Sequence, residues 1–137
     1  MEPEFVFIAL TILAALAWGI YYERRRRTAL QLYSDRKCQG KEWKYTFPES
    51  SATDIRAFLL LFVECFGFRA ENALRFSPSD RLLAIYRTSN PDRSAPDILE
   101  VETLARRLKE KYAIDLADIW NDDVTLGDVY RYARHAA

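Results

Sequence analysis

The chain has 137 residues and a mass of 16.0 kDa, which suits one small domain with an appendage and excludes two full domains. Twenty basic residues balance twenty acidic ones, so the net charge gives no general attraction to nucleic acid. Two cysteines and one histidine exclude a disulfide-rich scaffold and a four-thiolate zinc site. They also leave little material for histidine-based catalysis, so no metal or catalytic residue is expected.

The charge is divided unevenly along the chain. Residues 1–22 carry two acidic residues and no basic one, residues 23–44 carry eight basic against three acidic residues, and residues 45–137 carry twelve basic against fifteen acidic residues. The three regions therefore have net charges of −2, +5 and −3. This division predicts three parts with different physical roles.

Residues 1–27 are predicted to be a transmembrane anchor with flanking arginines. No charged residue occurs in residues 5–22, and as a helix this run would be about 27 Å long, close to the ~30 Å hydrocarbon core of a bilayer. The run is apolar on every side, which suits contact with lipid. The residues expected at the membrane interface are Trp18, Tyr21, Tyr22, Arg24, Arg25, Arg26 and Arg27.

The four arginines also predict an orientation. Because positive residues stay on the cytoplasmic side, the N-terminus would be outside and the C-terminal domain cytoplasmic. A cleaved signal peptide and a buried helix of a soluble protein are the alternatives, but Glu2 and Glu4 stand where a signal peptide usually has basic residues. In the reducing cytoplasm Cys38 and Cys65 would be free thiols.

Residues 28–50 are predicted to be a juxtamembrane linker. The membrane helix can continue through Thr28 to Tyr33, which contain no helix breaker, and Gly40 would end it. Residues 41–47 alternate loosely, which is typical of a short extended stretch or of a basic, aromatic segment resting on anionic headgroups. Such residues also occur in single-strand nucleic-acid sites, but beside a membrane span no nucleic-acid partner is predicted.

Residues 51–137 are predicted to form an all-α bundle of three to four helices. A first helix spans residues 52–66, with Ser51 as its cap and Gly67 at its end. A long connection follows, in which Leu82 to Tyr86 would form a brief helical turn capped by Ser79 or Asp80.

A second long helix is predicted to begin near Ser94, its capping residue, and to end at about Tyr112. Four apolar residues are expected in the loop after it: Ile114, Leu116, Ile119 and Trp120. Thr125 and Asp128 form a capping pair for a last helix that ends near Ala133.

The segments DILEVETLARRLKEKYAIDL and DDVTLGDVYRYA, in this order, resemble the acyl carrier protein family. In that family a four-helix bundle has a long loop after its first helix. The second helix opens with Asp-Ser-Leu, and a Thr-Val-Gly-Asp-like turn starts the last helix. The resemblance covers residues 52–135, and the matching residues are Asp97, Leu99, Leu104, Leu108, Tyr112, Ile114, Leu116, Thr125, Gly127, Asp128 and Val129.

One departure from the family decides the chemistry that the resemblance implies. The family attaches phosphopantetheine to the serine of Asp-Ser-Leu, and Ile98 stands at that position. An isoleucine has no hydroxyl group, so no phosphodiester can form there, and no cofactor is predicted. Ser94 is the nearest hydroxyl-bearing residue, and its capping role already explains its presence.

Two functions are compatible with these features. The chain would be a membrane-anchored, non-catalytic adaptor that binds a membrane-associated protein. The contact residues would be those at the position where carriers meet their enzymes: Asp97, Ile98, Glu100, Val101 and Glu102. Packing in the core is an equally good interpretation of Ile98. Alternatively, it would be a small accessory subunit of an integral membrane complex, held by small residues of the span such as Ala15 and Gly19. The sequence contains no phosphate-binding glycine loop, HExxH motif or nucleophile–histidine set, so enzymatic activity is not predicted.

Overall fold

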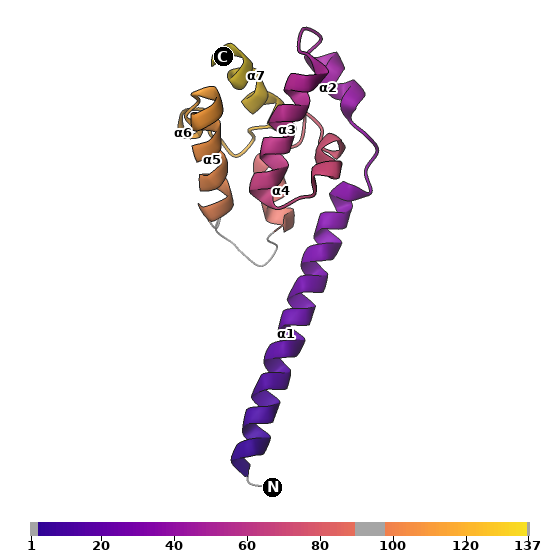
Figure 1. Ribbon diagram of the computed structural model, residues 1–137, viewed down its shortest axis with the longest axis vertical. Coiled ribbons are helices and arrows are strands. Elements are labelled where there is room, and N and C mark those ends of the chain that lie inside the picture. Colours follow the sequence, from indigo (N-terminus) through magenta and orange to yellow (C-terminus); the bar gives the residue numbers. More distant parts are fainter. Residues whose placement is uncertain (1–2, 90–97, 137) are drawn as a thin grey trace.

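The computed structural model describes residues 3–89 and 98–136 of the chain (Figure 1). Within these residues the regular structure is helical and contains no strand, which confirms the predicted all-α class. An isolated antiparallel bridge joins Arg81 to Thr125. The helices form a bundle from which one long helix projects (Figure 1).

The projecting helix, α1 (Pro3–Ser34), contains the predicted span. Its segment Pro3–Arg25 has a mean hydropathy of 2.1, is not buried against the rest of the chain, and is long and apolar enough to cross a membrane. The helix continues beyond the arginines to Ser34, as the absence of a breaker predicted. The N-terminal end of α1 lies far from the bundle, at the end of the molecule opposite the C-terminus (Figure 1).

The prediction that residues 41–47 are extended is wrong, and two of the three aromatic side chains considered for contact with headgroups, those of Trp43 and Phe47, are buried. Residues 41–46 belong to the helix α2 (Gly40–Thr46), which Phe47 follows directly and which lies at the end of the bundle remote from the N-terminus of α1 (Figure 1). Trp43 is fully buried and its Nε1 donates a hydrogen bond of 2.7 Å to the carbonyl of Phe76. Phe47, four residues later and therefore on the same helical face, is also buried, whereas Tyr45 is 86% exposed. The region predicted to be a linker thus supplies part of the core.

The helix α3 (Ala52–Phe66) has the predicted bounds. The side chain of Ser51 accepts a hydrogen bond of 3.1 Å from the backbone N–H of Asp54, as predicted for the cap. Gly67 ends the helix with φ 74°, a left-handed conformation that glycine adopts without strain. Because α3 is buried on several sides and packs against both the 3₁₀ helix η1 (Ala70–Arg75) and the helix α5 (Ile98–Tyr112), it is the central helix of the bundle.

The connection after α3 contains more helix than predicted. It forms a 3₁₀ helix, η1 (Ala70–Arg75), and a helix α4 (Leu82–Ser89). The carboxylate of Asp80, an expected cap of α4, accepts from the N–H of Ser77. The first N–H of α4, that of Leu82, donates to the carbonyl of Val124 at 3.0 Å. This partner lies far along the chain, so sequence spacing alone could not identify it.

The last three helices are α5 (Ile98–Tyr112), α6 (Leu116–Ile119) and α7 (Leu126–Ala136). The predicted end of α5 is confirmed, and its predicted cap, Ser94, lies outside the described residues. The segment expected to be a loop contains α6, because the side chain of Asp115 caps it by accepting from the N–H of Ala117. At α7, Thr125 and Asp128 exchange two hydrogen bonds of 3.1 Å, as predicted, and the helix ends three residues later than expected.

Candidate functional site

The residues predicted for the membrane interface follow one another along the middle of α1. Trp18, Tyr21 and Tyr22 are exposed, and the rings of Trp18 and Tyr21 lie 6.4 Å apart. Arg24, Arg25 and Arg27 are also exposed, and the side chain of Arg26 lies outside the described residues. The aromatic and basic side chains therefore stand between the apolar part of α1 and the part that reaches the bundle.

The last turn of α1 is attached to the bundle by Tyr33. Its ring stacks on Phe76 with centroids 5.0 Å apart and meets the edge of Phe68 at 5.9 Å. Its hydroxyl donates to Oγ1 of Thr88 in α4 at 3.5 Å. Burial raises the pKa of the Tyr33 phenol, while the hydrogen bond to Thr88 acts in the opposite direction. The long helix α1 and the bundle are thus joined by packed side chains.

The residues just after α1 are also fixed. Arg36 Nη1 lies 2.8 Å from Oδ2 of Asp80, and the side chains of this ion pair are only 30% and 17% exposed. The same carboxylate oxygen accepts a hydrogen bond of 2.7 Å from the N–H of Ser77. The guanidinium of Arg75 donates to the carbonyl of Arg36. These contacts extend the attachment of α1 to η1 and to the loop before α4.

The residues predicted to bind a partner lie around the start of α5. Asp97 and the side chain of Ile98 lie outside the described residues. Glu100 is partly exposed and Glu102 is exposed, whereas Val101 packs against the core. The bundle has one end nearer to the N-terminus of α1, and the start of α5 lies at that end (Figure 1).

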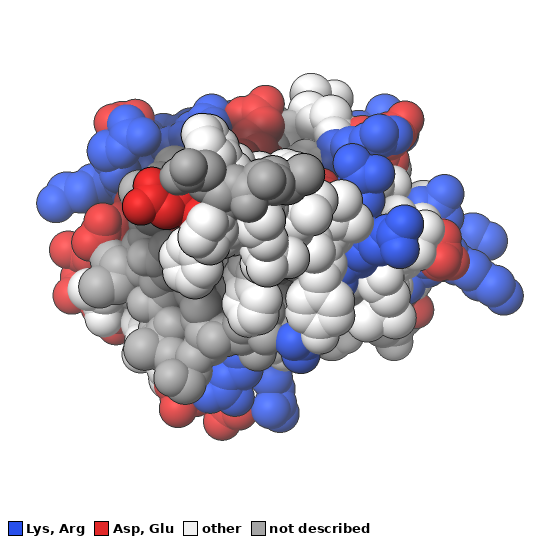
Figure 2. Space-filling model, turned by 90° about the horizontal axis from the view of Figure 1, so that it is seen from below, with Lys and Arg blue, Asp and Glu red and all other residues white. Residues whose placement is uncertain are grey.

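Figure 2 shows the molecule from that end. In this view α1 projects towards the viewer, so its uncharged side chains occupy the middle, and basic side chains lie around them with acidic ones interspersed (Figure 2). The face therefore does not carry a field of a single sign.

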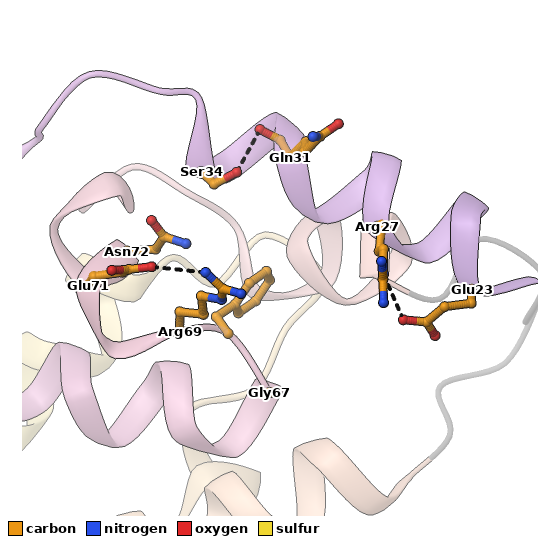
Figure 3. A pocket seen from close by; sticks show the side chains of 9 residues that line it. Glu23, Arg27, Gln31, Ser34, Gly67, Arg69, Glu71 and Asn72 are labelled. Atoms are coloured by element: carbon orange, nitrogen blue, oxygen red, sulfur yellow. Dashed lines mark hydrogen bonds and ion pairs between the residues drawn. The ribbon is translucent and has the colours of Figure 1, made fainter.

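A cleft of about 640 Å³ lies in the angle between α1 and the turn that follows α3. Glu23, Arg27 and Gln31 line one wall, and Arg69, Glu71 and Asn72 line the other (Figure 3). Each wall carries an ion pair: Arg27 Nε lies 3.1 Å from Glu23 Oε1, and Arg69 Nη1 lies 3.3 Å from Glu71 Oε1. Sequence spacing gave no signal for this cleft, because its walls are about forty residues apart in the chain and only the packing of α1 against the bundle brings them together.

The two thiols differ in their surroundings. Cys65 is buried in α3, and this burial raises its pKa, with the nearby Arg107 acting in the opposite direction. Cys38 is exposed. Among the described residues no group of histidine, cysteine, aspartate and glutamate side chains is placed to hold a metal ion.

Comparisons of the chain with known protein families, with curated proteins and with solved structures found no match.

Proposed function

We propose that this chain is a membrane-anchored, non-catalytic interaction module, similar in construction to an acyl carrier protein but without a prosthetic group, which acts as an adaptor at the cytoplasmic face. The observation that carries the proposal is the attachment of α1 to the bundle through Tyr33 and Arg36. This attachment keeps the start of α5 at the end of the bundle from which the apolar part of α1 extends (Figure 1). A carrier-like contact surface would therefore face a partner that is itself in the membrane.

The order of helices supports the carrier-like part of the proposal. A long first helix of the bundle, an irregular connection, a second long helix, a short helix and a capped last helix follow one another, which is the order that the resemblance implies. Ile98, at the position of the family's modified serine, begins α5. The intact mass after co-expression with a broad-specificity phosphopantetheinyl transferase should equal that of the unmodified chain, and a mass increase at Ser94 would contradict the proposal.

The distance to the membrane supports the choice of partner. From Arg25 to Ser34 α1 advances only about 13 Å at 1.5 Å per residue, so the bundle would lie close to the headgroups. Tethering there raises the local concentration of the bundle near a membrane-bound partner.

The proposal is tested by capturing the full chain from its own membranes in mild detergent and quantifying the proteins that co-purify. Glu102→Lys, at the exposed start of α5, should lower recovery of the partner about tenfold, since a reversed charge at an interface introduces repulsion. Glu42→Lys makes the same charge change on α2, at the remote end of the bundle, and should leave recovery unchanged. Equal recovery with both variants would contradict a contact at α5.

The alternative, an accessory subunit held by its membrane helix, is favoured by one observation. The surface of α1 in Pro3–Arg25 is uncovered, and a Cβ added at Gly19 would meet nothing within 4 Å. Replacement of residues 5–22 by leucines keeps the anchor but removes its small residues. Retained recovery of the partner would support the adaptor, and loss of the partner would support the accessory subunit.

A further inference from the structure

We propose that the cleft between α1 and η1 binds the headgroup of a membrane phospholipid that carries both a phosphate and a primary ammonium group, as phosphatidylethanolamine does. The inference rests on the membrane anchoring in the proposed function, but not on the adaptor role. Four charged residues carry it: Glu23 and Arg27 on α1, and Arg69 and Glu71 on the facing wall (Figure 3).

The level of the cleft along α1 is the first argument. The wall begins at Glu23, the residue directly after Tyr22 of the interfacial aromatic group. Arg27 lies one turn farther, about 6 Å along the helix axis, which is within the ~5–7.5 Å thickness of one headgroup layer in a bilayer with ~30 Å of hydrocarbon and ~40–45 Å in total. The cleft therefore opens where phospholipid headgroups lie, and it continues on the aqueous side of them.

The charges of the walls are the second argument. The two arginines supply planar donors that match phosphate oxygens, and the two glutamates supply acceptors for an ammonium group. The formal charges of the four lining residues cancel, so a purely anionic headgroup would meet two carboxylates that repel it. A headgroup with one charge of each sign meets a complementary partner for both.

Arg27 and Arg69 can exchange their carboxylate partners for a phosphate with little loss of folding free energy. The Arg27–Glu23 pair is 77% and 52% exposed, and the Arg69–Glu71 pair is 82% and 69% exposed. Exposed ion pairs of this kind contribute little to stability, so exchanging a carboxylate for a phosphate does not disturb the fold. Phe68, which also lines the cleft, is held against Tyr33 and Phe76, so the wall that carries Arg69 is fixed to α1.

A headgroup attached to a bilayer differs from the same group free in solution, because the membrane confines it beside the cleft at high effective concentration. The proposed ligand is the headgroup of a lipid in the bilayer. Soluble glycerophosphoethanolamine has the same phosphate and ammonium groups and serves as the probe that distinguishes the two sources.

The test uses the full chain in mild detergent and native mass spectrometry with lipids of identical acyl chains. Phosphatidylethanolamine should bind about fivefold more tightly than phosphatidylcholine, whose quaternary ammonium donates no hydrogen bond, and more tightly than phosphatidylglycerol, which has no amine. Soluble glycerophosphoethanolamine at the same concentration should not displace the bound lipid.

Three variants and one matched control locate the site. Arg27→Gln and Arg69→Gln should each weaken phosphatidylethanolamine binding about fivefold, because each removes a charge-assisted contact to phosphate. Glu71→Gln should lower the preference for phosphatidylethanolamine over phosphatidylcholine, because it removes one of the two carboxylates that accept from the ammonium group. Arg24→Gln removes an equal charge from the same helix outside the cleft and should leave binding unchanged.

Three results would overturn the proposal: equal binding of the three lipids, an equal effect of Arg24→Gln and Arg27→Gln, or displacement by the soluble headgroup at equal concentration. Flotation of the chain with vesicles is measured in parallel. If the chain floats with vesicles but shows no headgroup preference, the headgroup site is contradicted and the membrane anchor is supported. If the chain does not float, the membrane anchor itself is contradicted.

Discussion

Gly127 lies where the first turn of α7 meets the loop before α4. Its N–H donates to the carbonyl of Pro78 at 2.8 Å, and a Cβ at this position would lie only 2.8 Å from the same oxygen. The hydrogen bond and the close approach depend on each other, because any side chain would push the two segments apart. Here the glycine is required for space rather than for backbone conformation.

Gly127→Ala is therefore expected to lower the free energy of unfolding by about 1–3 kcal/mol, the usual effect of overpacking a rigid contact. Chemical denaturation of the full chain in mild detergent, followed by near-ultraviolet circular dichroism, measures the change. Gly40→Ala is the matched control, since its Cβ would meet only the sulfur of Cys38 at 3.5 Å. Equal stability of the two variants would contradict the contact at Pro78.

The two cysteines should differ in reactivity by about two orders of magnitude at about pH 8, because Cys65 reacts only after the bundle opens. Burial raises the pKa of Cys65 in the folded chain, so near the ordinary thiol pKa the native thiol keeps its proton while the unfolded one ionises. The stabilising contribution of Cys65 is therefore present below the unfolded pKa and is lost as pH rises through the folded pKa.

Thiol titration with a disulfide reagent checks this expectation. Cys38→Ser should abolish the fast phase and leave the slow one, which should accelerate under denaturing conditions. Two thiols that react at the same rate in the folded chain would rule out the burial of Cys65.

At the scale of elements, α2 shows how a short segment that follows the long helix α1 in the chain can belong to the core. Trp43 and Phe47 pack against Tyr130 of α7 with ring centroids 5.8 and 4.8 Å apart. Two arginines of α7, Arg131 and Arg134, lie over the ring of Phe47 at 5.7 and 5.8 Å. The element closes the end of the bundle remote from the N-terminus of α1.

Trp43→Phe should lower the free energy of unfolding by about 1–3 kcal/mol, because it leaves the buried carbonyl of Phe76 without its donor and removes ring volume. Tyr45→Ala, on the exposed face of the same helix, should change stability by less than about 0.5 kcal/mol. Denaturation of both variants under identical conditions compares them. Similar small effects would show that α2 is peripheral.

At the scale of the whole molecule, α1 consists of an apolar N-terminal part and a C-terminal end that packs against the bundle through its side chains. Cys38 follows this junction and is exposed, so it reports the side of the membrane on which the bundle lies.

If the arginines hold this end in the cytoplasm, as proposed, a membrane-impermeant maleimide should leave Cys38 unmodified in intact cells. Cys38 should then react fully once the membrane is opened. Glu2→Cys in a Cys38→Ser background places a thiol at the other end of the span and should react in intact cells. Reaction of Cys38 in intact cells would reverse the proposed orientation.

The same junction determines which fragment can fold. A fragment of residues 28–137 keeps Tyr33 and Trp43, whereas residues 48–137 alone would expose the surfaces that these two rings cover. The shorter fragment is therefore unsuitable for testing partner binding, although charge and composition suggested a boundary near residue 50.

The sequence by itself determined the features that depend on neighbours a few residues away. The apolar run of α1, the bounds of α3, the end of α5 and the capping pair of α7 follow from periodicity and from hydrogen bonds spanning three or four residues. Only the tertiary structure decided the helical form and burial of α2, the first partner of α4 and the cleft beside α1. Tyr33 meets Phe76 and Trp43 meets Tyr130 across long stretches of chain, and such contacts depend on how the helices pack rather than on local preference.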